Sequence, residues 1–530
     1  MAPHFANEFP SHLLMWQRVR EYAVPPSMIE TATARRAVGD WAGACAAARI
    51  DVDLDLRAVR DRHGTELVTR LRADLRRLAP DLLRWHMPRV APDGRLRPGL
   101  TVCLARYPGS GTTPLQLVVR TPPPWADAGQ RMSLTLWEGA GSGGPAHHPH
   151  PRPARRFRLD LHRHLWDAAR SGELARRCGA DGVPSSRSRA PDSPLPPNGS
   201  PWAVARWAAE AELLLRAEGH AARGAFTVRL GARHRAVWEL VAPDDSHAPT
   251  LRPLREVLPP QEVAALPVLP EAAARVLPDL ELLRAGLVPA ERLHPLVATA
   301  LTASGTASTV GRASVAGPAS MVGRASVAGP ASMVGRASVA GPASMVGAAP
   351  VAGPAPAPPP GDPHRVECRG EVHRIALRDG VLTPIDHDPT QLRREELLMA
   401  LGGPGLPCLR AIDAAHRAPE ALPAVHERLA HGDVVGALDV VEGLLGPGAV
   451  LRDGPLRDAL ESAAARRVDS GLFRAGLVAV RPGAAAVEGG DVPGGGQAAG
   501  GRRPRPDRRV RAGSSGKRSI RSRPRFSLFR

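Results

Sequence analysis

Histidines gather in one stretch of the chain, and their spacing could support metal chemistry. Five fall within eighteen residues: His147, His148, His150, His162 and His164. If residues 156–161 form a strand that continues, alternation places Asp160, His162 and His164 on one face. Two imidazoles at i and i+2 beside a carboxylate could hold Zn²⁺ or a similar metal. The competing interpretation is a solvated strand face, because Arg156, Arg158 and Arg163 add positive charge there.

Three other segments approach catalytic motifs and fail on their details. Residues 426–431 read HERLAH, but the second histidine comes at i+5, about 140° around a helix from the first instead of one turn away. Residues 513–519 lack the spacing and the hydroxyl residue of a phosphate loop. Residues 386–388 offer two carboxylates beside a histidine, yet Asp388 precedes Pro389 as the N-cap of a helix would. No reaction can therefore be named from these motifs.

The charge of the chain is concentrated at its end. The 530 residues carry a net charge of +18, of which residues 501–530 hold eleven Arg and one Lys against one Asp. This segment would bind polyanions through counterion release, without sequence preference. The absence of Lys elsewhere, with the many Ala, Gly and Pro, is typical of a high-GC bacterial genome. Arg abundance is then a weak sign of phosphate binding.

The cysteines and the hydropathy of the chain indicate in which cellular compartment the protein is expected. The five cysteines are scattered, odd in number and without metal-knuckle spacing: Cys45, Cys103, Cys178, Cys368 and Cys408. This pattern favours a reduced, cytoplasmic protein over a disulfide framework. Neither a signal peptide nor a run of about 20 apolar residues is present, so no membrane association is expected. A translation start at Val19 would make residues 1–18 a non-native extension.

The pattern of apolar residues predicts an α+β fold class. N-terminal helices are expected at Ser27–Val38, Trp41–Arg49 and Thr65–Ala79. An antiparallel β meander should follow, with strands at residues 100–106, 115–121, 132–137 and 156–161. A helix over 202–219 and a hairpin of 226–230 with 236–241 complete an α+β region at 19–300, which could divide into subdomains 19–178 and 201–300.

A linker and a second folded segment follow. Residues 310–345 are three identical copies of VGRASVAGPASM. Their Gly-Pro content and lack of apolar periodicity predict a disordered linker over 301–363. Residues 364–480 are predicted to form a C-terminal, mainly α-helical domain with a β-hairpin that turns at Asp379-Gly380. The Arg-rich tail, 481–530, is expected to be disordered.

One pattern occurs in both folded segments. Residues 37–44 and 430–437 share A-x-G-D-x-x-G-A, which predicts a Gly C-cap, an Asp N-cap and two closely approaching helices. The second copy, followed by ALDVVEGLL, resembles half of a tetratricopeptide-type hairpin, a helical repeat family that binds peptides and protein partners. The alternative is an ordinary αα-hairpin.

These observations lead to three function hypotheses. The first is a non-enzymatic cytoplasmic interaction or regulatory scaffold, with an unknown protein partner and two units tethered by the linker. The second is a metal-dependent enzyme that uses Asp160, His162 and His164. The third is a protein that contacts nucleic acid non-specifically through residues 501–530.

Overall fold

The structure is a computed structural model of the whole chain. It describes residues 10–108, 114–139, 148, 151–180, 201–220, 223–231, 234–241, 249–254, 258–303 and 365–477. The predicted linker and the tail beyond residue 477 lie outside these ranges. The described residues form mixed helices and mainly antiparallel sheets, which confirms the α+β fold class.

The N-terminal unit begins with helices that pack on a sheet. They are α1 (Ser11–Tyr22), α2 (Pro26–Ala37), α3 (Trp41–Ala47), α4 (Leu56–Arg77) and α5 (Pro80–His86). Helix α4 is longer than predicted but buries the expected stripe, with Leu67, Leu71 and Leu75 inside. Helix α1 places Leu13 and Val19 in the main core.

A four-stranded sheet forms the centre of this unit, in the order β1-β6-β5-β4. Strands β4 (Thr101–Tyr107), β5 (Leu115–Arg120) and β6 (Met132–Trp137) form the predicted antiparallel meander. Strand β1 (Ile50–Asp53), which the sequence analysis missed, pairs in parallel with β6. A short hairpin of β2 (Arg89–Val90) and β3 (Arg95–Leu96) follows α5.

The predicted fourth strand of the meander, at 156–161, is wrong. Only an isolated parallel bridge joins Arg158 to Cys103. The chain then turns into the 3₁₀ helices η4 (Arg163–Leu165) and η5 (Ala168–Glu173) before α6 (Leu174–Cys178). Turn hydrogen bonds such as His162 N to Leu159 O replace the ladder, because the chain curls over the sheet edge instead of extending along it.

Residues 201–303 contribute to two cores. Helix α7 (Trp207–Ala217) packs on the sheet of β7 (Gly224–Arg229), β8 (Arg235–Val241) and β9 (Thr250–Pro253), around Trp207 and Trp238. The predicted hairpin is thus confirmed. The following elements are α8 (Pro260–Ala265), α9 (Glu271–Ala274), α10 (Pro278–Arg284) and α11 (Pro295–Ala303). Helices α10 and α11 join the main core rather than the second one.

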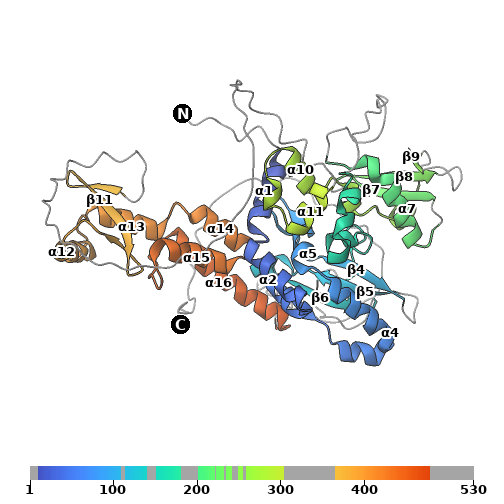
Figure 1. Ribbon diagram of the computed structural model, residues 1–530, viewed down its shortest axis with the longest axis horizontal. Helices are drawn as coiled ribbons and strands as arrows, with labels where there is room; N and C mark the ends of the chain where they lie inside the picture. Colours follow the sequence, from blue (N-terminus) through green and yellow to red (C-terminus); the bar gives the residue numbers. More distant parts are fainter. Residues whose placement is uncertain are drawn as a thin grey trace, which may run out of the picture.

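The C-terminal unit matches its predicted elements closely. A sheet of β10 (Arg365–Cys368), β11 (Glu371–Arg378) and β12 (Val381–Pro384) precedes five helices. The helices are α12 (Pro389–Ala400), α13 (Pro407–Arg417), α14 (Leu422–Ala430), α15 (Val434–Leu445) and α16 (Pro455–Arg474). The β10–β12 sheet and α12 occupy one end of the long axis, and β7–β9 the other (Figure 1).

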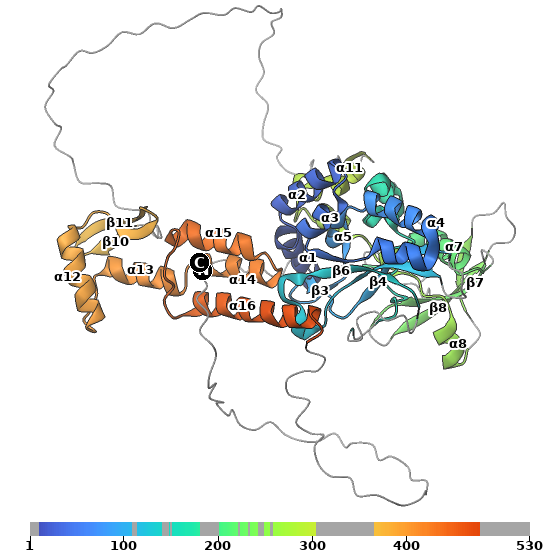
Figure 2. The same cartoon turned by 90° about the horizontal axis from the view of Figure 1, so that it is seen from below.

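The two units are in direct contact. The sequence had predicted only that a linker joins them. The C-terminal end of α16 reaches the N-terminal unit (Figure 2), and there the rings of Phe473 and Trp125 meet edge to face with centroids 5.3 Å apart. Arg18 pairs with Glu427 at 3.2 Å, and Arg49 pairs with Asp433 at 3.1 Å. These contacts hold α14–α16 against α1 and the sheet.

Candidate anion-binding cavity

A cavity of about 460 Å³ opens in the N-terminal unit. Helix α1 and the end of α5 form one side, and strand β2 lies next to them. The segments 156–165 and 271–281, far apart in sequence, close the other side. A volume of this size is in the range of small-molecule sites.

The wall carries an excess of basic side chains. Eight arginines and three histidines line it: Arg20, Arg89, Arg97, Arg156, Arg158, Arg177, Arg206, Arg275, His12, His86 and His164. Glu271 and Glu281 are the two carboxylates in the same wall.

Some of these arginines have carboxylate partners. The guanidinium of Arg20 contacts both oxygens of buried Asp279, at 2.9 and 2.7 Å. Arg177 contacts Glu210 at 2.8 Å. Arg156 and Arg275 share Glu271. These paired groups build the wall and leave little charge available for a ligand.

Arg89, Arg97 and Arg206 form no ion pair with a carboxylate among the described residues. Arg89 is buried, donates one hydrogen bond to Arg84 O at 2.8 Å, and leaves Nε and Nη1 without partners. The Nε atoms of Arg97 and Arg206 are buried and also lack partners. Burial, with the charge of Arg20 adding, lowers the pKa of Arg89 to about 9, so its guanidinium still carries a proton at neutral pH.

Two histidines extend this set of unpaired groups. His86 Nε2 and His164 Nδ1 are buried without hydrogen-bond partners. Burial lowers the pKa of His86 to about 3, although nearby Asp279 acts in the opposite direction. Burial, followed by the charges of His162 and Arg177, lowers the pKa of His164 well below its ordinary value. Both rings are therefore neutral at pH 7, and each has one nitrogen without a hydrogen-bond partner.

The rest of the wall is apolar and partly aromatic. Trp16 from α1 and Phe157 from the opposite segment are lining side chains, with Met87 and Leu165 beside them. Arg156 lies over the Phe157 ring, 5.1 Å from its centroid. The cavity thus combines unpaired cations with surfaces that could cover an apolar or planar group.

The predicted metal ligands lie beside this cavity and are not brought together as a three-ligand set. Asp160 is held by Arg158, at 2.6 Å, and by Arg106, at 3.3 Å. Both ring nitrogens of His162 lie at hydrogen-bond distance from protein oxygens, Arg158 O at 3.0 Å and Glu210 at 3.1 Å, so each already has a protein partner. His164 alone lines the cavity. His147 and His150 lie outside the described residues.

Glu210 balances the positive charge of this cluster. Burial alone would raise the pKa of Glu210, but hydrogen bonds from His162 and Arg177 outweigh it and lower the pKa to about 2. The carboxylate therefore stays ionised and balances the positive charge around it. No local pattern in the sequence indicates this partner, because Glu210 lies 48 residues from His162.

A cavity lined by cationic side chains that have no carboxylate partner can bind an anion and orient it. A guanidinium offers a planar pair of donors that matches a carboxylate or phosphate. The residues that matter here were missed because Arg was discounted as a compositional feature. The one available signal was the run of basic and aromatic residues in R84-W-H-M-P-R-V90, which places Arg89 and His86 close together.

Comparisons of the chain with protein-family models, with curated proteins and with solved structures found no match. Among the described residues, no helix is both long enough and apolar enough to cross a membrane.

Proposed function

We propose that this chain is a regulatory protein whose N-terminal unit binds a small organic anion in the cavity between α1 and the segments 156–165 and 271–281. The observation that carries the proposal is buried Arg89, which lines the cavity and whose Nε and Nη1 have no hydrogen-bond partner. Buried donors without partners cost about 1–3 kcal/mol each, and more when charged. Such groups persist where a ligand supplies the missing acceptors.

The wall specifies the class of ligand. Arg89, Arg97 and Arg206 favour one or two carboxylate or phosphate groups. Trp16 and Phe157 favour an apolar or planar body attached to them. His86 and His164 can each accept a hydrogen bond from a hydroxyl or an N–H group, because their neutral rings keep a lone pair.

The same elements that line the cavity also contact the C-terminal unit, which supports a regulatory role. Helix α1 directs His12 and Trp16 into the cavity and Arg18 toward Glu427. Arg18 also donates to Pro92 O at 2.8 Å, just beyond the cavity-lining strand β2. A ligand that shifts α1 or β2 would therefore alter the contact between the two units.

A ligand screen on the full chain tests this proposal. Dicarboxylates, tricarboxylates, phosphomonoesters and nucleotides would be compared by thermal shift and then by isothermal titration calorimetry. We expect at least one class to bind with a Kd near or below the micromolar range, and Arg89→Met to weaken that binding at least tenfold. Arg72→Met is the matched control, because Arg72 is exposed on the solvent face of α4.

Two results would count against the proposal. One is the absence of binding by every anion class at millimolar concentration. The other is a binding anion whose affinity is the same in the wild type, Arg89→Met and Arg206→Met, since the ligand would then bind elsewhere, for example to residues 501–530.

The remaining sequence hypotheses stay proposals with narrower support. A cytoplasmic location is supported by the five cysteines, all of which are free and buried. A protein partner for the C-terminal unit is supported by the confirmed helical hairpin at Asp433, whose side chain accepts a hydrogen bond from Gly436 N. Polyanion contact through residues 501–530 concerns a segment outside the described residues.

A further inference from the structure

The end of the C-terminal unit has very little apolar core. Around β10–β12 and α12, the buried cluster comprises three leucines and two cysteines: Leu392, Leu406, Leu409, Cys368 and Cys408. Leu397 and Leu398 of α12 and Leu401, which follows the helix, remain exposed. Small folded units with so little buried apolar area usually need a disulfide or a structural metal.

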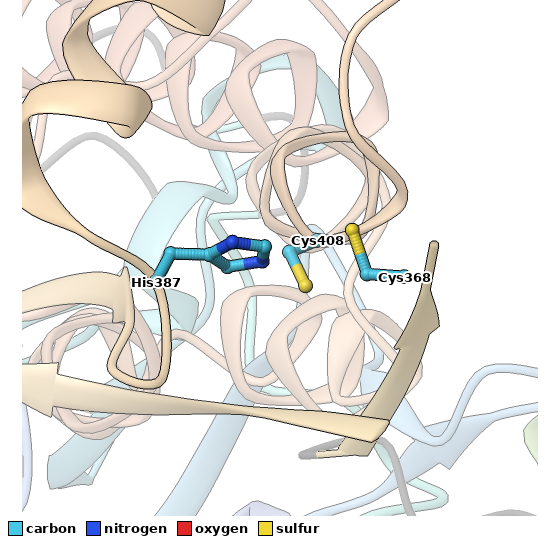
Figure 3. A group of neighbouring side chains, drawn as sticks. All are labelled: Cys368, His387 and Cys408. Carbon is cyan, nitrogen blue, oxygen red and sulfur yellow. The ribbon is translucent and has the colours of Figure 1, made fainter. Parts of the chain in front are cut away.

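The two cysteines of this cluster meet a histidine. The Sγ atoms of Cys368 and Cys408 and a ring nitrogen of His387 lie within 4.8 Å of one another. In Figure 3 the His387 ring points toward the two cysteines. Both cysteine side chains are completely buried. No other such group of three possible ligands occurs among the residues that the structure describes.

We propose that Cys368, Cys408 and His387 bind a zinc ion that holds this end of the C-terminal unit together. Two thiolates and an imidazole form a ligand set that Zn²⁺ prefers. Tetrahedral bonds of about 2.3 Å from zinc to each sulfur would place the two sulfurs ~3.8 Å apart, which fits ligand atoms that all lie within 4.8 Å of one another. This site is separate from the anion cavity and does not depend on the proposed function.

Local structure brings each ligand to the site from a different element. Cys368 ends β10 immediately before the tight turn at Arg369 and Gly370, both with positive φ. Cys408 lies in the first turn of α13, directly after Pro407. His387 precedes Asp388, whose side chain caps α12 by accepting from Gln391 N.

An unpaired nitrogen in the same cluster supports the proposal independently. His387 Nε2 is buried and has no hydrogen-bond partner. The ring of His373 stacks on that of His387 with a centroid separation of 4.0 Å and an interplanar angle of 11°. This stacking fixes the His387 plane, so His373 is a positioning residue for the ligand.

Metal analysis of the full-length protein tests the site directly. Protein produced with zinc supplementation and purified without chelator should contain about one zinc per chain. After exchange with Co²⁺, an intense thiolate-to-cobalt charge-transfer band and tetrahedral d–d bands should appear. The cobalt spectrum needs no variant, so it remains informative even if ligand substitutions impair folding.

Substitutions then assign the ligands. Cys368→Ser, Cys408→Ser and His387→Asn should each reduce bound zinc at least tenfold. Cys45→Ser is the matched control, because Cys45 is equally buried but lies in the main core. His164→Gln serves as a second control for the predicted His-rich site, and it should leave the zinc content unchanged.

Three results would overturn the proposal. They are zinc well below stoichiometric amounts despite supplementation, a cobalt spectrum without thiolate charge transfer, and a Cys368–Cys408 disulfide found by mass spectrometry in freshly purified protein. Zinc that survives both cysteine substitutions but is lost in His164→Gln would place the metal at the histidine-rich segment instead.

Discussion

Arg49 Nη2 lies 3.1 Å from Asp433 Oδ1, and this pair joins the end of α3 to the start of α15 across 384 residues of sequence. Arg49 also donates to His431 O at 2.9 Å. Asp433 meanwhile caps α15 and accepts from Arg428 at 2.8 Å. One aspartate therefore both begins a helix and fixes the contact between the two units.

Replacing this aspartate should weaken the contact between the units without removing the helix cap. Asp433→Asn keeps a side-chain oxygen for Gly436 N but leaves largely buried Arg49 without a carboxylate. We expect a loss of about 1–3 kcal/mol in the free energy of unfolding, measured by urea denaturation followed by circular dichroism. Asp40→Asn is the control: Asp40 caps α3 in the same motif but pairs only with exposed Arg35, so it should cost at most about 0.5 kcal/mol. Equal losses in the two variants would contradict this role.

The glycines of the repeated motif differ in what surrounds them. Gly39 and Gly432 both have positive φ, 77° and 82°. A Cβ at Gly432 would collide with the backbone of Gly129 in the N-terminal unit, whereas one at Gly39 would meet nothing within 4 Å. Gly432→Ala should therefore lower the free energy of unfolding by at least about 1 kcal/mol more than Gly39→Ala does, because the backbone must shift to make room for the new Cβ. The strain of a positive φ is common to both variants. Limited proteolysis should also release the C-terminal unit faster in Gly432→Ala than in Gly39→Ala.

Two buried arginines of the cavity should respond in opposite ways to the same substitution. Arg20→Met leaves Asp279 buried without its ion-pair partner, and we expect a loss of about 3–5 kcal/mol. Arg89→Met removes a buried charge that has no carboxylate partner, and we expect a gain of about 1 kcal/mol together with the loss of anion binding. Thermal and urea unfolding of the ligand-free protein would test both. Destabilisation by Arg89→Met comparable to that of Arg20→Met would show that Arg89 supports the fold and not a ligand.

Stability should fall when the pH drops from 7.5 to 5.5. Burial lowers the pKa of His86 and of His431 to about 3, below the ordinary value of about 6.5 that the unfolded chain has. As the pH falls below 6.5 the unfolded chain binds protons that the folded chain cannot, so each histidine costs about 1 kcal/mol at pH 5.5.

The variant His86→Gln should reduce this pH dependence by about a third, because buried His164 also has a strongly lowered pKa and contributes beside His86 and His431. The readout is the difference in unfolding free energy between the two pH values. The groups that act on His86 are Asp279, Arg20 and His294. An unchanged slope in His86→Gln would mean that other groups cause the dependence. Carboxyl groups with lowered pKa, such as Glu210, act only at lower pH and do not enter this window.

Local sequence determined much of the secondary structure. The Asp379-Gly380 turn joins β11 to β12 as predicted, and Asp388 caps α12 through Gln391 N. These features depend on the residues within one turn or hairpin, so their types and spacing suffice to predict them. The predicted strand at 156–161 was wrong because the alternation of apolar and polar residues is a local pattern. It does not reveal the turns and 3₁₀ helices that packing against neighbouring segments imposes there.

The candidate sites required the tertiary structure. The ligands proposed for zinc are separated by 19 and 21 residues of chain, and Glu210 reaches His162 across 48. The sequence by itself determined the α+β class, most element boundaries and the capping residues, because these follow from interactions over a few residues. Only the tertiary structure decided which arginines have no carboxylate partner and which cysteines lie beside a histidine. Burial and pairing depend on segments that are far apart in the sequence and that folding brings together.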